Sequence, residues 1–151
     1  MGTDFNRIDV VFDRYYKESI KCGTRQKRSR GSRPISREVE DRAVPLPSNL
    51  IDFIALPENK EDLVKFLSEQ LIEQAPHDKI LILARGFEDE AEVWSSAEMV
   101  DTNQQSAHQE EANTIIILHC VHSDTDSVVV AAQDTDVLIL LLAHFNKMTC
   151  T

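Results

Sequence analysis

Three groups of acidic residues carry side chains that could bind a metal ion. They are Asp13, the pair Glu110-Glu111, and Asp134 with Asp136. Carboxylates that converge repel one another unless a cation neutralises them, and hard ions such as Mg²⁺ and Mn²⁺ prefer oxygen ligands. Two such ions can activate a water and stabilise the leaving oxygen when a phosphodiester is cleaved. Each group alone is a weak signal, since most Asp-x-Asp sequences are turns or helix caps.

Strands and helices alternate around these carboxylates. Apolar, β-branched runs predict buried strands at 7–12, 79–84 and 127–132. Helical spacing of apolar residues predicts helices at 60–74, 109–122 and 137–145, with a short turn of helix at 50–56. We expect 14–30 to be partly helical, 32–59 to be an irregular connection and 87–105 to be an excursion from the core. This order predicts an α/β fold with a mostly parallel sheet.

Three of the acids follow predicted strands. Asp13 comes directly after the strand at 7–12, and Asp134 and Asp136 come after the one at 127–132. Open α/β sheets bind ligands beyond the carboxyl ends of their strands. We therefore expect a site where these strands end.

The surroundings of the three acidic groups strengthen this interpretation. Val10-Val-Phe-Asp13 precedes a basic run, Glu110-Glu111-Ala112-Asn113 opens a predicted helix, and Val129-Val-Ala-Ala-Gln-Asp134-Thr-Asp136 ends a predicted strand. In this order the blocks resemble the flap-endonuclease/XPG-like branch of the PIN-like nuclease superfamily, over residues 8–140. The resemblance implies a three-layer α/β domain and a two-ion Mg²⁺ or Mn²⁺ site. Its implied ligands are Asp13, Glu111, Asp134 and Asp136, with Glu110 and Asn113 as weaker candidates.

The resemblance also implies nucleic acid as the partner, DNA or RNA in flap or single-stranded form. The residues that would bind it are Lys17, Lys21, Arg25, Lys27, Arg28 and Arg30. Residues 1–42 hold eleven of the sixteen Lys and Arg residues and carry a balance of +4, whereas 43–151 carry −14. A basic segment beside an acidic body suits a protein that binds polyanions and cations, although a solvated basic segment explains the charge equally well.

The chain departs from the family pattern at several points. Asn113 occupies the position of a second carboxylate, and the chain lacks a helix-hairpin-helix part. The family also has an aspartate on an earlier N-terminal strand, whereas here only six residues precede the first predicted strand. We therefore expect one partial PIN-like domain over 1–151, with a basic and irregular insertion at 14–59 and a helix-strand-helix-strand-helix core at 60–145. Metal affinity should be weak and cleavage slight or absent. The alternatives are a non-catalytic nucleic-acid-binding or interaction module, or a non-functional remnant of a nuclease-like gene.

Composition and short motifs bear on membrane insertion, cellular location and zinc binding. The chain is 42% hydrophobic and 28% charged, and no apolar run reaches the roughly 18 residues of a membrane span. Three widely spaced cysteines and the absence of a secretory signal favour an intracellular protein, and the basic run 25–33 favours the nucleus. His119 and His122, with Asp124 and Asp126, could bind zinc, but a chance arrangement is the preferred interpretation. The oligomeric state is left open.

Overall fold

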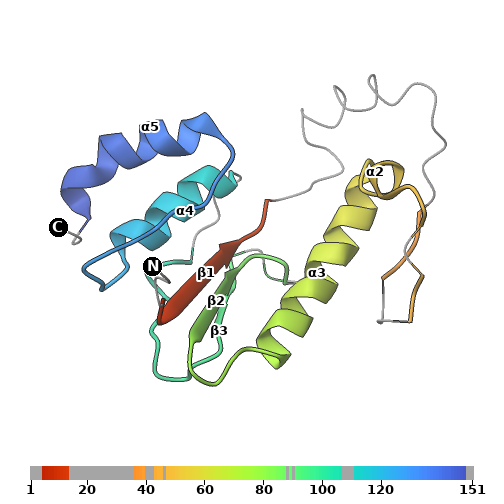
Figure 1. The fold of residues 1–151 in the computed structure, drawn as a ribbon, viewed down its shortest axis with the longest axis horizontal. Coiled ribbons are helices and arrows are strands. Elements are labelled where there is room, and N and C mark those ends of the chain that lie inside the picture. The colour runs from red at the N-terminus through yellow and green to blue at the C-terminus, as the bar shows by residue number, and fades with distance from the viewer. Residues whose placement is uncertain are drawn as a thin grey trace.

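The computed structural model describes residues 5–13, 36–39, 43–45, 47–87, 89, 91–106 and 111–148. Along the chain they form β1 (Arg7–Val11), α2 (Leu50–Phe53), α3 (Pro57–Glu73), β2 (Ile80–Ala84), β3 (Val93–Ser95), α4 (Ala112–Val121), α5 (Thr135–His144) and the 3₁₀ turn η1 (Phe145–Lys147) (Figure 1). The protein is therefore mixed α/β, as predicted. The partly helical segment expected at 14–30 lies outside the described residues.

The described sheet has three strands in the order β1-β2-β3. β1 and β2 are parallel, with Arg7 opposite Ile80 and Val11 opposite Ala84. β3 is antiparallel to β2, with Leu83 opposite Trp94. The prediction of a mostly parallel sheet is thus wrong for this part, because β3, which lies within the predicted excursion 87–105, pairs with β2 in the antiparallel direction. An antiparallel neighbour needs only a short connection, whereas a parallel one needs a long crossover.

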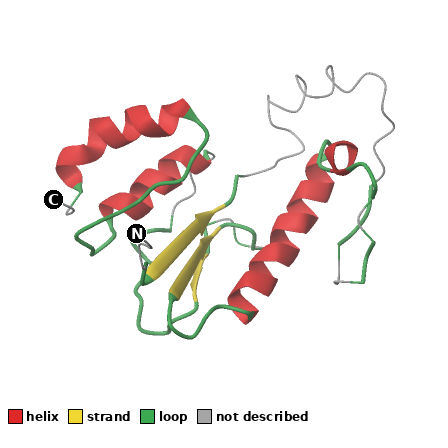
Figure 2. Cartoon of the chain, in the orientation of Figure 1, coloured by secondary structure: helices red, strands yellow, loops and turns green. Residues whose placement is uncertain are grey.

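β2 forms the centre of the core. Leu81 to Ala84 are consecutive and all buried, so both faces of the strand are covered. Figure 2 shows α3 on one side of the sheet and the α4–α5 pair on the other. Ile115 of α4 and Val137 of α5 are each only 2% exposed, and they extend the core between the two helices.

The turn after β2 brings the backbone close to α3. Gly86 has φ +91°, and a Cβ built there would lie 2.2 Å from Ser68 Oγ and 3.0 Å from Val64 Cγ1. Ser68 is fully buried, and its hydroxyl donates to the Val64 carbonyl at 2.8 Å. Both the left-handed backbone and the close approach therefore require glycine here.

The predicted strand at 127–132 is wrong. These residues are neither helix nor strand, and Val129 is 66% exposed. A β-branched run becomes a strand only when a neighbouring strand completes its hydrogen bonds, and this run joins no ladder in the described sheet. Asp134 therefore does not end a strand. It is instead the N-cap residue of α5, and its side chain accepts a hydrogen bond from the backbone N–H of Asp136.

The four predicted helices are confirmed, with ends that differ by a few residues. α3 begins at Pro57, because proline is well suited to a first helical turn, and it ends just before Pro76. α5 begins two residues earlier than predicted because Asp134 caps it. No helix among the described residues is long and apolar enough to cross a membrane.

Candidate functional site

The described acids of the predicted metal site lie at the starts of α4 and α5 and just beyond β1. Asp13 follows β1 by two residues, Glu111 is the N-cap residue of α4, and Asp134 is that of α5. β1 runs toward the end at which α4 and α5 begin (Figure 1). All three residues are exposed, as is Asp136 in the first turn of α5. Acids at helix N-termini stabilise the helix by interacting with its positive end, so Glu111, Asp134 and Asp136 also have an ordinary structural explanation.

One hydrogen bond joins the second and third sequence blocks. The Asn113 amide donates from Nδ2 to Asp134 Oδ2 at 3.0 Å, which links the first turn of α4 to the cap of α5. The other carboxylate oxygen, Asp134 Oδ1, accepts from the Asp136 backbone N–H at 3.0 Å. Both oxygens of Asp134 are therefore already hydrogen-bonded. Each keeps lone-pair capacity, but a cation would have to compete with or share these contacts.

The acids do not form a closed metal cage in the described part of the chain. There, no three Asp, Glu, His or Cys side chains gather closely enough to hold one ion. The structure joins Asn113, Asp134 and Asp136 by hydrogen bonds. The full ligand set of Asp13, Glu111, Asp134 and Asp136 stays a prediction. The weaker candidate Glu110 lies outside the described residues.

The predicted nucleic-acid-binding side chains also lie outside the described residues. They are Lys17, Lys21, Arg25, Lys27, Arg28 and Arg30. Their role therefore remains an expectation from the sequence. Two of the three cysteines also lie outside the described residues, whereas Cys120 is buried in α4.

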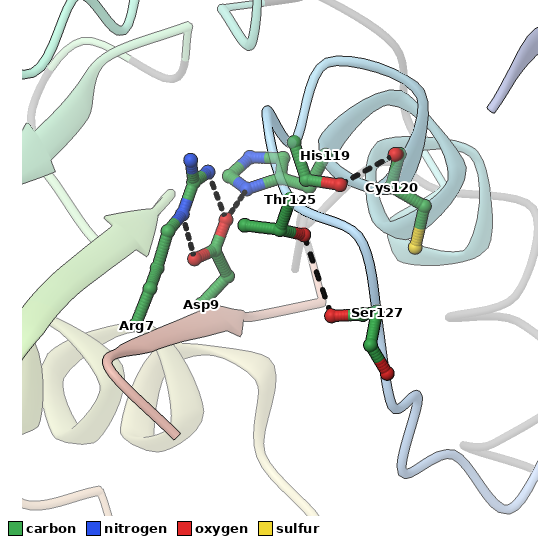
Figure 3. A network of polar contacts seen from close by, with 7 residues as sticks. Arg7, Asp9, His119, Cys120, Thr125 and Ser127 are labelled. Atoms are coloured by element: carbon green, nitrogen blue, oxygen red, sulfur yellow. Dashed lines mark hydrogen bonds and ion pairs between the residues drawn. The ribbon is translucent and has the colours of Figure 1, made fainter. Parts of the chain in front are cut away.

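A second constellation, which the sequence interpretation missed, connects β1 to α4 (Figure 3). The Arg7 guanidinium donates to both oxygens of Asp9, from Nε to Oδ1 at 2.7 Å and from Nη2 to Oδ2 at 2.6 Å. His119 Nδ1 lies 2.7 Å from the same Asp9 Oδ2. Arg7 and Asp9 are two residues apart on one strand, so their side chains share a face. We call these three residues the Arg7–Asp9–His119 network.

The Arg7–Asp9–His119 network lies mostly out of water. The His119 side chain is 4% exposed and that of Asp9 20%. Burial by itself raises the pKa of the Asp9 carboxyl, but hydrogen bonds from Arg7 and His119, with their electrostatic attraction, outweigh it and hold that pKa below its usual value. Because Asp9 is therefore ionised at neutral pH, His119 donates to it from Nδ1. His119 Nε2 is buried and has no hydrogen-bond partner among the described residues.

The sequence held a signal for this network. Arg7 and Asp9 occupy alternate positions in a run predicted to be a buried strand, and buried charges require a partner. The partner itself could not be found, because His119 is 110 residues away from Asp9. His119 is buried in the core, whereas His122 is exposed at the end of α4. Polar contacts of the following loop lie nearby, among them Thr125 Oγ1 to the Ser127 carbonyl at 3.3 Å (Figure 3).

No protein-family model, curated protein or solved structure matches this chain.

Proposed function

We propose that this chain is a PIN-like, nuclease-derived domain that binds Mg²⁺ or Mn²⁺ and acts weakly on DNA or RNA phosphodiesters. The ligands would be Asp13, Glu111, Asp134 and Asp136. The observation that carries the proposal is the Asn113–Asp134 hydrogen bond, because it joins two of the three sequence blocks across the α4–α5 pair. The position of Asp13, beyond the end of β1 at which both helices begin, supports it further.

The donor chemistry suits a hard divalent cation, since every proposed ligand offers carboxylate oxygens. The arrangement does not favour tight binding. The Asn113 amide contributes no charge and uses one oxygen of Asp134, and the helix cap uses the other. A bound ion therefore gains little from Asp134 unless these contacts rearrange. This is the structural reason to expect weak metal affinity.

Each part of the chain has a separate task in this proposal. The bound ions would supply an activated water and stabilise the leaving oxygen. β1 and the two helices hold the carboxylates, while the basic residues between 17 and 30 bind the phosphate backbone. Backbone binding by lysine and arginine depends strongly on salt because it releases counterions.

Calorimetric titration with Mn²⁺ tests the proposal. The test variant is Asp134→Ala with Asp136→Ala. The chain offers a matched control in Asp124 and Asp126, which also flank a single threonine and are exposed. We expect saturable binding that the test variant loses and the Asp124→Ala, Asp126→Ala variant keeps. Equal binding by all three proteins, or none by any, would refute the metal site.

A second candidate is a non-catalytic nucleic-acid-binding module. The observations that favour it are the engaged oxygens of Asp134 and the basic balance of residues 1–42. It predicts that a fluorescent single strand or flap binds in EDTA at low salt, with affinity that falls as salt rises. Fluorescence anisotropy measures this directly. Absence of binding at low salt would remove this candidate, while a strict requirement for divalent metal would favour the nuclease proposal.

A further inference from the structure

The apolar side chains of α4 do not by themselves fix the position of this helix along β1. Its sequence includes Ile115, Ile116, Ile117 and Leu118 in succession, and apolar side chains of similar size replace one another readily. Hydrophobic burial is non-directional, so sliding α4 by one turn could still bring apolar side chains, Leu118 with Cys120 or Val121, to the places of Ile115 and Ile117. Among the buried residues of α4, His119 is the one that makes a described side-chain hydrogen bond to β1.

We propose that the Arg7–Asp9–His119 network sets the axial register of α4 on β1 and thereby places Glu111 level with Asp13. A slip of α4 would separate His119 from Asp9, which would leave a half-buried carboxylate without one of its two partners and the buried His119 Nδ1 without an acceptor. Arg7 holds the Asp9 carboxylate by both oxygens, so Oδ2 is already oriented to receive His119. The register itself is independent of metal, and only its consequence for ligand placement rests on the proposed function.

The spacing along the two elements supports this assignment. α4 runs antiparallel to β1 (Figure 1). The residues before His119 on the helix therefore lie toward the same end as the residues after Asp9 on the strand. Asp13 lies four residues beyond Asp9, about 13 Å at roughly 3.3 Å per residue. Glu111 lies eight residues before His119, about 12 Å at roughly 1.5 Å per residue. Both candidate ligands therefore lie toward the same end, each about 12–13 Å along its element from the residues that join α4 to β1.

A change of register would break this match. One helical turn displaces α4 by about 5.4 Å, which would carry Glu111 well above or below Asp13. The link from Asn113 to Asp134 would move with the helix, so the α5 cap would shift as well. His119 and Asp9 are thus positioning residues, since they act on the candidate site through α4 and β1.

Methyl NMR of the full chain tests the register directly. Nuclear Overhauser contacts between the isoleucine methyls of α4 and the valine methyls of β1 report which residues lie opposite each other. Two substitutions are compared with the unaltered protein: His119→Leu, which cannot bond Asp9, and His119→Asn, whose side-chain N–H lies near the position of Nδ1. We expect His119→Asn to keep the original contacts and His119→Leu to show a shifted or second set. Original contacts in His119→Leu would overturn the proposal.

A variant that fails to fold does not leave the question open. If His119→Leu is unfolded by circular dichroism, Asp9→Asn replaces it, because this substitution keeps the shape of the side chain and removes its charge. The proposal then requires a second set of methyl contacts in Asp9→Asn, and a single original set overturns it. A role in stability alone would lower the urea midpoint of these variants without moving the contacts.

Mn²⁺ titration of the same proteins separates this inference from the proposed function. If both hold, His119→Leu binds Mn²⁺ about tenfold more weakly, and His119→Asn restores most of the affinity. If no protein binds Mn²⁺ but the methyl contacts shift in His119→Leu, the register inference stands and the proposed function fails. If all proteins bind equally and the contacts are unchanged, the register inference fails and the proposed function stands.

Discussion

The substitution Asn113→Asp places a carboxylate where the amide now donates to Asp134. In the present structure Nδ2 of Asn113 lies 3.0 Å from Asp134 Oδ2. The substitution removes the donor and brings two negative charges close together. Without a cation the two carboxylates repel each other, whereas a divalent cation between them would be held by both. The variant should therefore be less stable than the original protein in chelator and respond more strongly to metal.

The size of the effect follows from the geometry. Loss of the hydrogen bond costs about 0.5–1.5 kcal/mol. Repulsion between unit charges about 4 Å apart adds about 1 kcal/mol at the dielectric of water, which is the appropriate limit for these partly exposed side chains. The free energy of unfolding should thus fall by about 2 kcal/mol in EDTA. For a chain of this length, that corresponds to a decrease in Tm of about 4–8 °C.

Thermal unfolding in EDTA measures the loss of stability, and thermal unfolding in Mn²⁺ measures the response to metal. Asn113→Ala is the matched control, because it loses the same hydrogen bond without gaining a charge, and its Tm should fall about half as far. At an Mn²⁺ concentration of about one hundred times the Kd, binding adds about 2.7 kcal/mol, so the Asp variant should recover its Tm while the Ala variant recovers less. The reasoning would be refuted if the two variants had the same Tm in EDTA and responded equally to Mn²⁺.

Three further outcomes test other parts of the structure. The folded-state pKa of Asp9 is lowered, so its stabilising contribution is present above about pH 4 and is lost as pH falls through the folded pKa. Asp9→Asn should therefore make the urea midpoint depend less on pH below pH 4. A pH profile parallel to that of the original protein would contradict this. Gly86→Ala should lower the free energy of unfolding by about 2–4 kcal/mol through positive φ and crowding, and Ser68→Ala should relieve part of the loss. Replacing Lys17 and Lys21 by glutamine should reduce the slope of log affinity for single strands against log salt by about 1.4; an unchanged slope would exclude these contacts.

Local sequence signals predicted most of the elements correctly. The helix that became α3 was evident from the spacing of Leu63, Val64 and Phe66, and its end from Pro76. β1 and β2 were evident from short apolar runs. These signals suffice because a helix or strand with one strongly apolar face must bury it, whatever it packs against.

The same signals failed where an element needs a distant partner. The run Val128 to Val130 has high β-propensity but joins no described ladder, and the short strand at Val93 to Ser95 has a weak pattern yet pairs with β2. Strand formation requires hydrogen bonds to another segment, so propensity alone cannot decide it. The composition of the sheet therefore could not be read from single runs of residues.

The sequence by itself determined the order of the elements, the position of Asp13 after a strand and the placement of acids beside α4 and α5. Only the tertiary structure decided that Asp9 pairs with His119 and that Asn113 donates to Asp134. The physical reason is that apolar burial is tolerant of partner and position, whereas a hydrogen bond or ion pair is directional and needs two particular atoms about 3 Å apart. Residues far apart in the chain meet that condition only after the helices have packed on the sheet.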